Sequence, residues 1–146
     1  MTAMHLQAVV DVHILFVDGQ GRWLFSQRCN IGDNDGEYAL VAGYLEYGET
    51  LKQCAIRAAA NEIGVDLQEA ALEFCHVMRR GGEQVRISFF FVCHEWQGEI
   101  GDNELDACSG LIWRAPHDLP QPMVEYVALA LRNIRTGQSV GDLAWL

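Results

Sequence analysis

The feature that most constrains the fold is a helix within residues 43–65 whose two ends are both marked by particular residues. Thr50 and Gln53 have the spacing of a capping box, which satisfies free backbone N–H groups at a helix start. Gly64 stands where a left-handed residue commonly ends a helix. The apolar residues between them recur at helical spacing and include Ile56, Ala59 and Ile63. We therefore predict a helix that starts at Thr50, follows a loop and faces a core.

Apolar segments on both sides of this helix have the length and composition of β-strands. They cover residues 7–17, 22–28, 37–43, 72–80, 85–96 and 110–114. A second helix should follow Pro120 and Pro122 and end at Gly137, while residues 29–36 form a loop and 138–146 remain unassigned. This order of strands and helices favours an α+β fold, an α/β/α sandwich, over repeating βαβ units.

Composition limits the class of protein. The 146 residues are 50% hydrophobic and 21% charged, which fits one domain (1–146) with a real core. The formal net charge of -10 would repel phosphate backbones, so we expect no nucleic-acid polymer as partner. Five cysteines without a CxxC pair favour a reducing compartment. No apolar run is long enough to span a membrane, so we expect a cytoplasmic protein with no membrane partner.

Residues 43–65 also carry glycine, glutamate and arginine at fixed spacings. Gly43 is followed after five residues by Glu49, and after seven more by Arg57. The remaining matching positions are Ala59, Glu62, Gly64 and Val65. This arrangement resembles the Nudix box. The surrounding segment GEYALVAGYLEYGE is similar to the ADP-ribose and nucleotide-sugar pyrophosphatase branch of that family.

The resemblance implies a mixed β-sheet packed between α-helices, with the box forming a loop, a helix and a loop. It also implies a hydrolase that cleaves a diphosphate linkage in a nucleoside diphosphate linked to another moiety. Such a reaction needs charge neutralisation on the phosphates and an activated water, and Mg²⁺ (or Mn²⁺) can supply both. The implied partner is a nucleotide-like small molecule, and a homodimer stays open.

The metal-binding face of the box differs from the family pattern at two positions. The family has glutamates where this chain has Ala58 and Asn61. Positions 58, 61 and 62 are spaced to share one helix face, so one carboxylate remains of three. We expect Glu62 to be a metal ligand rather than a solvated helix residue. The resemblance adds the backbone carbonyl of Ala42, while Asn61 offers either a weak neutral ligand or polar surface.

Four further charged residues are candidates for the site. Arg57 and Glu49 match the family's structural ion pair, which braces the loop against the helix, and we assign both to the catalytic site with Glu62. Arg28 ends the second predicted strand, close to where the family binds substrate phosphates, so we favour a substrate-binding role over a surface role. Glu46 faces metal or substrate, or is a surface charge of the acidic loop.

The acidic segment WQGEIGDNE offers candidates for the catalytic base, because some relatives take a base or an extra ligand from such a loop. Glu99 and Glu104 are the two we name. Asp102 and Asp106 crowd the same loop, and a solvated acidic loop is the alternative.

Other notable residues have plainer interpretations. Arg79 and Arg80 end a predicted strand, and a surface role is the default for both. The pairs Cys75-His76 and Cys93-His94 should be core or edge residues. The aromatic run at 89–91 should be sheet core with one outward face.

These observations support three hypotheses. The first is a metal-dependent Nudix pyrophosphohydrolase. The second is a protein of the same fold that binds a nucleotide-like ligand without cleaving it, because Ala58 and Asn61 replace box glutamates. The third is an isomerase or a purely structural protein, since fold alone does not decide function.

Overall fold

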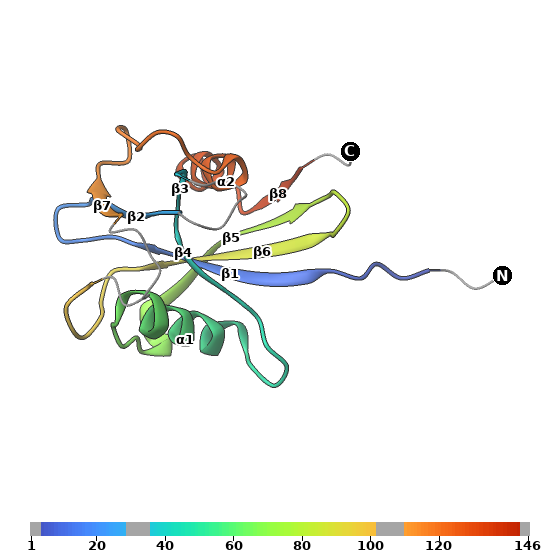
Figure 1. The fold of residues 1–146 in the computed structure, drawn as a ribbon, viewed down its shortest axis with the longest axis horizontal. Coiled ribbons are helices and arrows are strands. Elements are labelled where there is room, and N and C mark those ends of the chain that lie inside the picture. The colour runs from blue at the N-terminus through green and yellow to red at the C-terminus, as the bar shows by residue number, and fades with distance from the viewer. Residues whose placement is uncertain (1–3, 29–35, 102–109, 144–146) are drawn as a thin grey trace.

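The computed structural model describes residues 4–28, 36–101 and 110–143. In these residues the two α-helices lie on opposite sides of a mixed sheet (Figure 1). The helices are α1 (Leu51–Ile63) and α2 (Glu125–Arg135), with a short 3-10 helix at Glu69–Ala71. The α+β sandwich expected from the order of elements is therefore confirmed.

The main sheet has five strands in the order β4-β1-β6-β5-β8. β1 lies near its centre and pairs antiparallel with β4 and parallel with β6. β5 pairs antiparallel with β6 and parallel with β8. The bounds are β1 Val9–Phe16, β4 Val41–Tyr44, β5 Leu72–Arg80, β6 Arg86–Cys93 and β8 Val140–Asp142.

A second, three-stranded sheet has the order β3-β2-β7. Its strands are β2 Trp23–Gln27, β3 Tyr38–Ala39 and β7 Leu111–Arg114. The turn between β1 and β2 is closed by a hydrogen bond from the Gly21 N–H to the Asp18 carbonyl. Gly21 has a φ of 78°, a conformation that glycine adopts at little cost.

Alternation along β1 separates two hydrophobic cores. Val12, Ile14 and Phe16 pack with α1 in the first core. Leu15 and Val17 point to the opposite face and join α2 in the second. Both faces of β1 are therefore buried, as its long apolar run predicts.

Helix α1 begins and ends where its caps predict. Thr50 is the N-cap and forms the complete capping box with Gln53. Gly64 is left-handed, with a φ of 73°, and its N–H donates to the carbonyls of Ala59 and Ala60. Ala59 and Ile63 are fully buried, whereas Ile56 is only partly buried at the edge of the core.

Three predicted boundaries differ from the structure. The segment 37–43 is split at Leu40 into β3 and β4, which belong to different sheets. The segment 85–96 leaves the sheet after Cys93. The unassigned tail contains β8, an edge strand whose Val140 is exposed, so no apolar alternation marked it.

No helix of the described residues is long and apolar enough to cross a bilayer.

The box glycine lies against helix α1. An ideal Cβ built on Gly43 would lie 3.0 Å from the Cβ of Ala58, closer than side chains normally approach. Gly43 pairs with Val12 in the sheet, so the backbone of β4 cannot easily move away. The close approach of β4 and α1 therefore requires glycine at position 43.

We predict that Gly43→Ala will destabilise the protein by about 1–3 kcal/mol, the usual cost of overpacking a tight contact. Urea denaturation should show a lower midpoint with an unchanged slope. Gly19→Ala is the control, because an added Cβ there meets nothing within 4 Å. Equal midpoints for the two variants would show that the contact at Gly43 is not limiting.

Candidate functional site

Arg57 connects three parts of the box. Its Nε donates to Glu49 Oε2 at 2.7 Å and its Nη2 donates to Glu49 Oε1 at 3.0 Å. Nη2 also donates to the backbone carbonyl of Tyr44 at 2.7 Å. One planar guanidinium thus joins helix α1, the loop before it and the end of β4. The ion pair predicted from the box spacing forms in the structure.

The brace has a clear electrostatic signature. The hydrogen bonds from Arg57, and the N–H of Glu46 donating to the same carboxylate, lower the pKa of Glu49 to about 2. The carboxylate in turn raises the pKa of Arg57. Glu46 is a more distant partner, with its Oε2 3.8 Å from Arg57 Nη1 and most of its side chain exposed. Glu46 therefore lies beside the brace.

The three positions of the expected metal face have different surroundings. Ala58 is buried at 4% exposure against Gly43, Asn61 is exposed and Glu62 is partly buried. One carboxylate oxygen of Glu62, Oε2, is withdrawn from solvent. Ala58 therefore belongs to the core of the box rather than to an open face.

The described residues hold few metal donors in one place. Among them, no group of three or more His, Cys, Asp and Glu side chains is placed to hold a metal ion. The metal-donor roles of the Glu62 carboxylate and the Ala42 carbonyl stay predictions; Ala42 lies in β4 and pairs with His13 of β1.

The remaining site candidates lie in several places. Arg28 follows β2 and is partly buried, and its Nε is buried without a hydrogen-bond partner in the part of the chain described. Glu99 is exposed after the isolated bridge of Gln97 with Asp66. Glu104 lies outside the described residues, as do Asp102 and Asp106. Their roles stay predictions.

A second polar cluster, which we call the β1–β5 network, lies on the α2 side of the sheet. His13 Nε2 is 2.8 Å from Asp11 Oδ1, and Arg80 Nη2 donates to Asp11 Oδ2 at 3.2 Å. Arg80 Nε donates to Ser88 Oγ at 3.3 Å, and its guanidinium lies 3.5 Å from the centre of the Tyr126 ring. Asp11, His13 and Ser88 are almost completely buried.

Asp11 is held in its charged form by this network. Burial would raise the pKa of its carboxyl, but hydrogen bonds with His13 and Ser88 and the charge of Arg80 bring it below its ordinary value. His13 also stacks on Phe90, with ring centroids 4.6 Å apart. The network is therefore a charged cluster within an aromatic core.

Sequence reasoning missed this network. The default surface role for Arg80 was wrong, because only 16% of its side chain is exposed. A signal was available, since two polar residues spaced by two in an apolar strand must point to the same face. Arg79 points to the other face and pairs with Asp142 at 2.8 Å.

The cysteine and histidine pairs behave largely as expected. His76 and Cys93 are fully buried, and burial raises the pKa of the Cys75 thiol to about 12. His94 differs, since it is exposed just beyond the end of β6. In the aromatic run, Phe90 and Phe91 are core residues and Phe89 is partly buried, as predicted.

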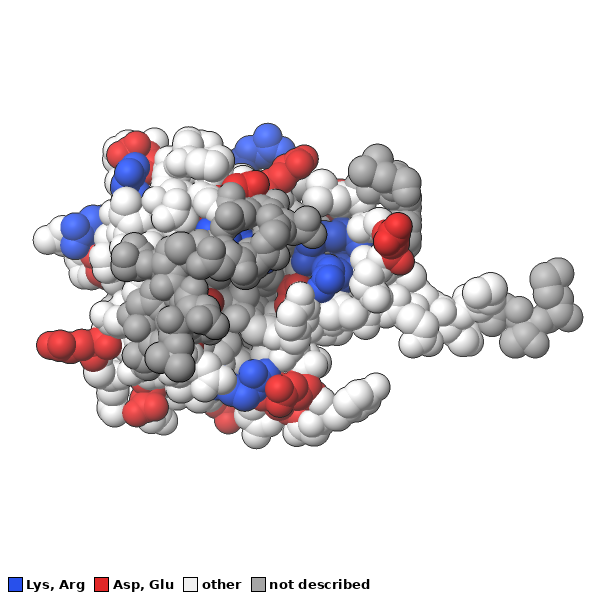
Figure 2. All heavy atoms as spheres, viewed as in Figure 1, with Lys and Arg blue, Asp and Glu red and all other residues white. Residues whose placement is uncertain are grey.

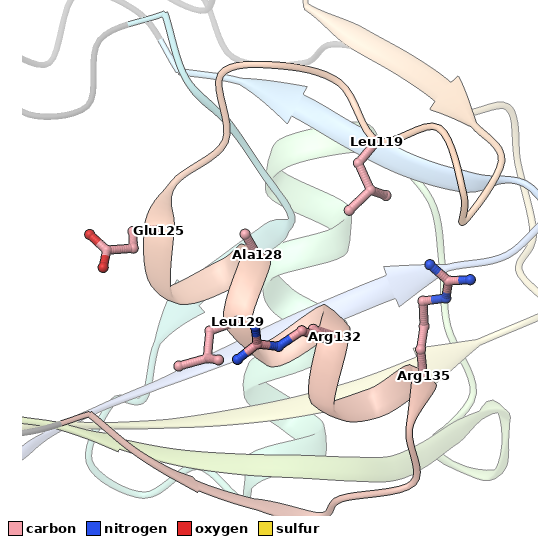
Figure 3. A pocket seen from close by; sticks show the side chains of 6 residues that line it. All are labelled: Leu119, Glu125, Ala128, Leu129, Arg132 and Arg135. Carbon is pink, nitrogen blue, oxygen red and sulfur yellow. The ribbon is translucent and has the colours of Figure 1, made fainter.

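A surface hollow of about 540 Å³ lies beside α2 (Figure 3). It is lined by Leu119, Glu125, Ala128, Leu129, Arg132 and Arg135. Its helical lining belongs to the side of α2 away from the core residues Val127, Ala130 and Leu131. The five-stranded sheet lies between this hollow and α1, so the chemistry of the box does not belong to it.

The sequence of the chain matches the NUDIX domain model over residues 7–133. The chain belongs to the NUDIX domain family. Nudix hydrolases generally cleave a nucleoside diphosphate linked to another moiety, and generally use divalent metal ions.

Among curated proteins, this Nudix chain is similar to the NAD-capped RNA hydrolase NudC of Vibrio atlanticus (strain LGP32), with 33% identity over 64 residues. The aligned stretch is 44% of this chain and 23% of that protein. The chain therefore matches about a quarter of the curated relative's length.

Solved structures share the fold over nearly the whole chain. A MutT NUDIX hydrolase from Burkholderia pseudomallei has a TM-score of 0.78 and 24% identity, covering 87% of this chain and 98% of that one. The NUDIX domain of Shewanella oneidensis NrtR, solved in complex with ADP ribose, has a TM-score of 0.73 and 14% identity. It covers 90% of this chain and 89% of that one. At these identities the likeness establishes the Nudix fold.

We predict that Arg57→Ala will loosen the loop before α1, because it leaves Glu49 and the Tyr44 carbonyl without their shared donor. The melting temperature should fall at neutral pH. The parent should also lose stability as the pH falls from about 4.5 towards 2, since Glu49 has a lowered pKa in the folded state. The variant should lack this part of the acid dependence.

Thermal melts of both proteins across this pH range provide the measurement. Arg22→Ala is the matched control, because Arg22 forms an ion pair with Asp18 in the β1–β2 turn, away from the box. An Arg57→Ala variant that melts like the parent at every pH would show that the brace has no structural role.

Proposed function

We propose that the protein is a divalent-metal-dependent Nudix hydrolase that cleaves the diphosphate linkage of a nucleoside diphosphate joined to another moiety. Hydrolysis of that linkage yields two phosphomonoesters, one on the nucleoside and one on the other moiety. The observation that carries the proposal is the complete brace of the box, in which Arg57 binds both oxygens of Glu49. The brace fixes the loop and the helix that carries Glu62, which is the arrangement the family uses for hydrolysis.

The residues have distinct proposed roles. Glu62 presents its carboxylate from the last turn of α1 and is a metal ligand, with the carbonyl of Ala42 as a second donor. Arg57 and Glu49 fix the loop and helix that set the position of Glu62. Arg28 binds a phosphate group, and Glu46, which lies beside Arg57, faces the substrate. Glu99 and Glu104 are the candidates for the base that takes the proton from water.

The two proposed donors, Glu62 and Ala42, fit a metal ion that obtains most of its ligands from the substrate and from water. Magnesium binds hard oxygen atoms and is often held by one or two carboxylates together with substrate phosphates. When bound, the ion neutralises phosphate charge and lowers the pKa of a coordinated water. Glu62 and Ala42 supply two oxygen donors, so the substrate's phosphates have to complete the site. Mn²⁺ would satisfy the same donors.

The alternative is a Nudix-fold protein that binds a nucleotide-like ligand without cleaving it. Two observations favour it: Ala58 is packed against Gly43, and no three-donor cluster exists in the described residues. The NrtR domain solved with ADP ribose makes a ligand of this chemistry a reasonable probe. The site would then retain phosphate contacts without a competent metal centre.

We predict that Glu62→Gln will abolish metal-dependent hydrolysis, since it removes the box carboxylate on which the site depends. The assay measures mononucleotide released from ADP-ribose, NADH and a nucleotide sugar with Mg²⁺ or Mn²⁺. Calorimetry should show weak Mg²⁺ binding to the free protein and tighter binding with ligand present, because the ligand's phosphates supply oxygen atoms.

Glu125→Gln is the matched control, because Glu125 is an exposed glutamate on α2, across the sheet. This variant should keep full activity. If the parent binds ADP-ribose but releases no product with either metal, the binding-protein alternative replaces the enzyme. Tight Mg²⁺ binding to the free protein would contradict the proposed metal site.

We predict that Ala58→Glu with Asn61→Glu will raise metal-dependent hydrolysis, because it restores carboxylates at the family's positions. The two substitutions should differ in their effect on stability. Asn61 is exposed and should accept glutamate. Position 58 is buried against Gly43, so glutamate there should lower the free energy of unfolding by about 1–3 kcal/mol in the absence of metal. Bound Mg²⁺ should return part of that stability by mass action.

Asn61→Glu alone is the control that separates added charge from a rebuilt site. Melting temperatures with and without Mg²⁺ and the rate of product release should be measured on both variants. Glu62→Gln introduced into the double variant should remove the gain. Unchanged turnover in a double variant that binds Mg²⁺ would remove the main support for the enzyme.

A further inference from the structure

Arg80 is held in one orientation by three contacts. Its Nε donates to Ser88, its Nη2 donates to Asp11, and its flat face lies on the Tyr126 ring. The third nitrogen, Nη1, donates no hydrogen bond within the described residues, and 16% of the Arg80 side chain is exposed. An arginine fixed in this way has already lost its rotamer freedom, so a ligand that uses Nη1 meets a prepared donor.

Burying the charged network that fixes Arg80 has a desolvation cost, which its hydrogen bonds and ion pair offset. Asp11 is 6% exposed and Ser88 is fully buried, so the ion pair has been moved out of water. Replacing a buried ion pair by apolar side chains of similar volume is often neutral or stabilising. The arrangement therefore suggests a use for the guanidinium beyond holding the sheet and α2 together.

A second arginine lies beside the first. Arg86 on β6 is the direct partner of Arg80 on β5, so both side chains leave the sheet on the same face. Like charges opposite each other on neighbouring strands are destabilising. Arg86 donates to the Tyr44 hydroxyl at 3.1 Å and has no carboxylate partner in the described part of the chain. The pair therefore carries positive charge that Asp11 only partly balances.

The surroundings reinforce this charge. Arg28 is close enough to Tyr126 that its charge acts on the tyrosine's ionisation together with that of Arg80. Basic atoms gather right of centre in Figure 2, above β1 and near β5 and β6 as placed in Figure 1. The formal net charge of the chain is -10, so a local excess of arginine contrasts with the rest of the protein. An anion is the ligand that this face would attract.

We propose that Arg80 and Arg86 form a binding site for a phosphate group, with Arg80 Nη1 as a fixed donor and Arg86 as a second, more exposed cation. Asp11, Ser88 and Tyr126 are positioning residues that hold the guanidinium of Arg80. In the proposed function, this site binds a phosphate of the nucleotide-like ligand on the α2 side of β1. The inference rests on that function for the identity of the ligand but not for phosphate binding itself.

The test is calorimetric titration of the metal-free protein with pyrophosphate, AMP and adenosine. Arg80→Gln should weaken pyrophosphate and AMP binding by about 10- to 100-fold, the expected loss for a charge-assisted hydrogen bond. Arg86→Gln should weaken both by a smaller factor. Adenosine, which lacks phosphate, should respond equally in parent and variants.

Arg79→Gln is the matched control, since Arg79 is the adjacent arginine of β5 but points to the opposite face, where it pairs with Asp142. Arg80→Gln leaves Asp11 buried without its cation, so thermal melts must show that the variant is folded. Arg86→Gln leaves the contact between Arg80 and Asp11 in place. It therefore tests the site even if the first variant does not fold.

The outcomes are distinct. A loss for both AMP and pyrophosphate assigns the site to a nucleotide phosphate, and a loss for pyrophosphate alone assigns it to the free anion. Unchanged affinities in Arg86→Gln and in folded Arg80→Gln, or losses equal to those in Arg79→Gln, would overturn the proposal. Glu62→Gln should not alter metal-free phosphate binding. A lack of turnover would therefore count against the proposed hydrolase activity but not against the proposed phosphate site.

Discussion

The bidentate contact between Arg57 and Glu49 is the interaction on which the candidate site depends. A guanidinium presents its N–H groups in a fixed plane, so binding both carboxylate oxygens sets the direction as well as the distance of the contact. The same Nη2 also binds the Tyr44 carbonyl at the end of β4. Helix, loop and strand are therefore fixed relative to one another. Glu62 lies on the same helix as Arg57, so its position depends on this contact.

Local signals predicted the helices better than they predicted long-range contacts. Thr50, Gln53 and Gly64 act within a few residues of themselves, so the bounds of α1 could be predicted from sequence. The Arg57–Glu49 pair could be predicted because its spacing matches a known box. Arg80 and Asp11 are 69 residues apart and have no such template. Their contact depends on β1, β6 and β5 lying side by side, which sequence alone did not specify.

The match to the family and the departures from it involve different kinds of residue. Gly43, Arg57 and Gly64 match, and each supports the conformation of the box through close packing, hydrogen bonding or a left-handed backbone. Ala58 and Asn61 depart, and they stand where the family has glutamates. Ala58 also fills space against Gly43, so the box can pack well without those carboxylates. Conformation and catalysis therefore place separate demands on one short segment.

The short strand β8 affects how this edge of the sheet can pair with another chain. It pairs with Val77, Met78 and Arg79 of β5 and so occupies backbone groups of those three residues. β5 also carries Phe74, whose side chain is 48% exposed. An uncovered strand with apolar side chains is a template for pairing with another chain. Because it pairs with β8, the stretch 77–79 of β5 is not available to the strand of another chain, whereas Phe74 lies outside the paired stretch.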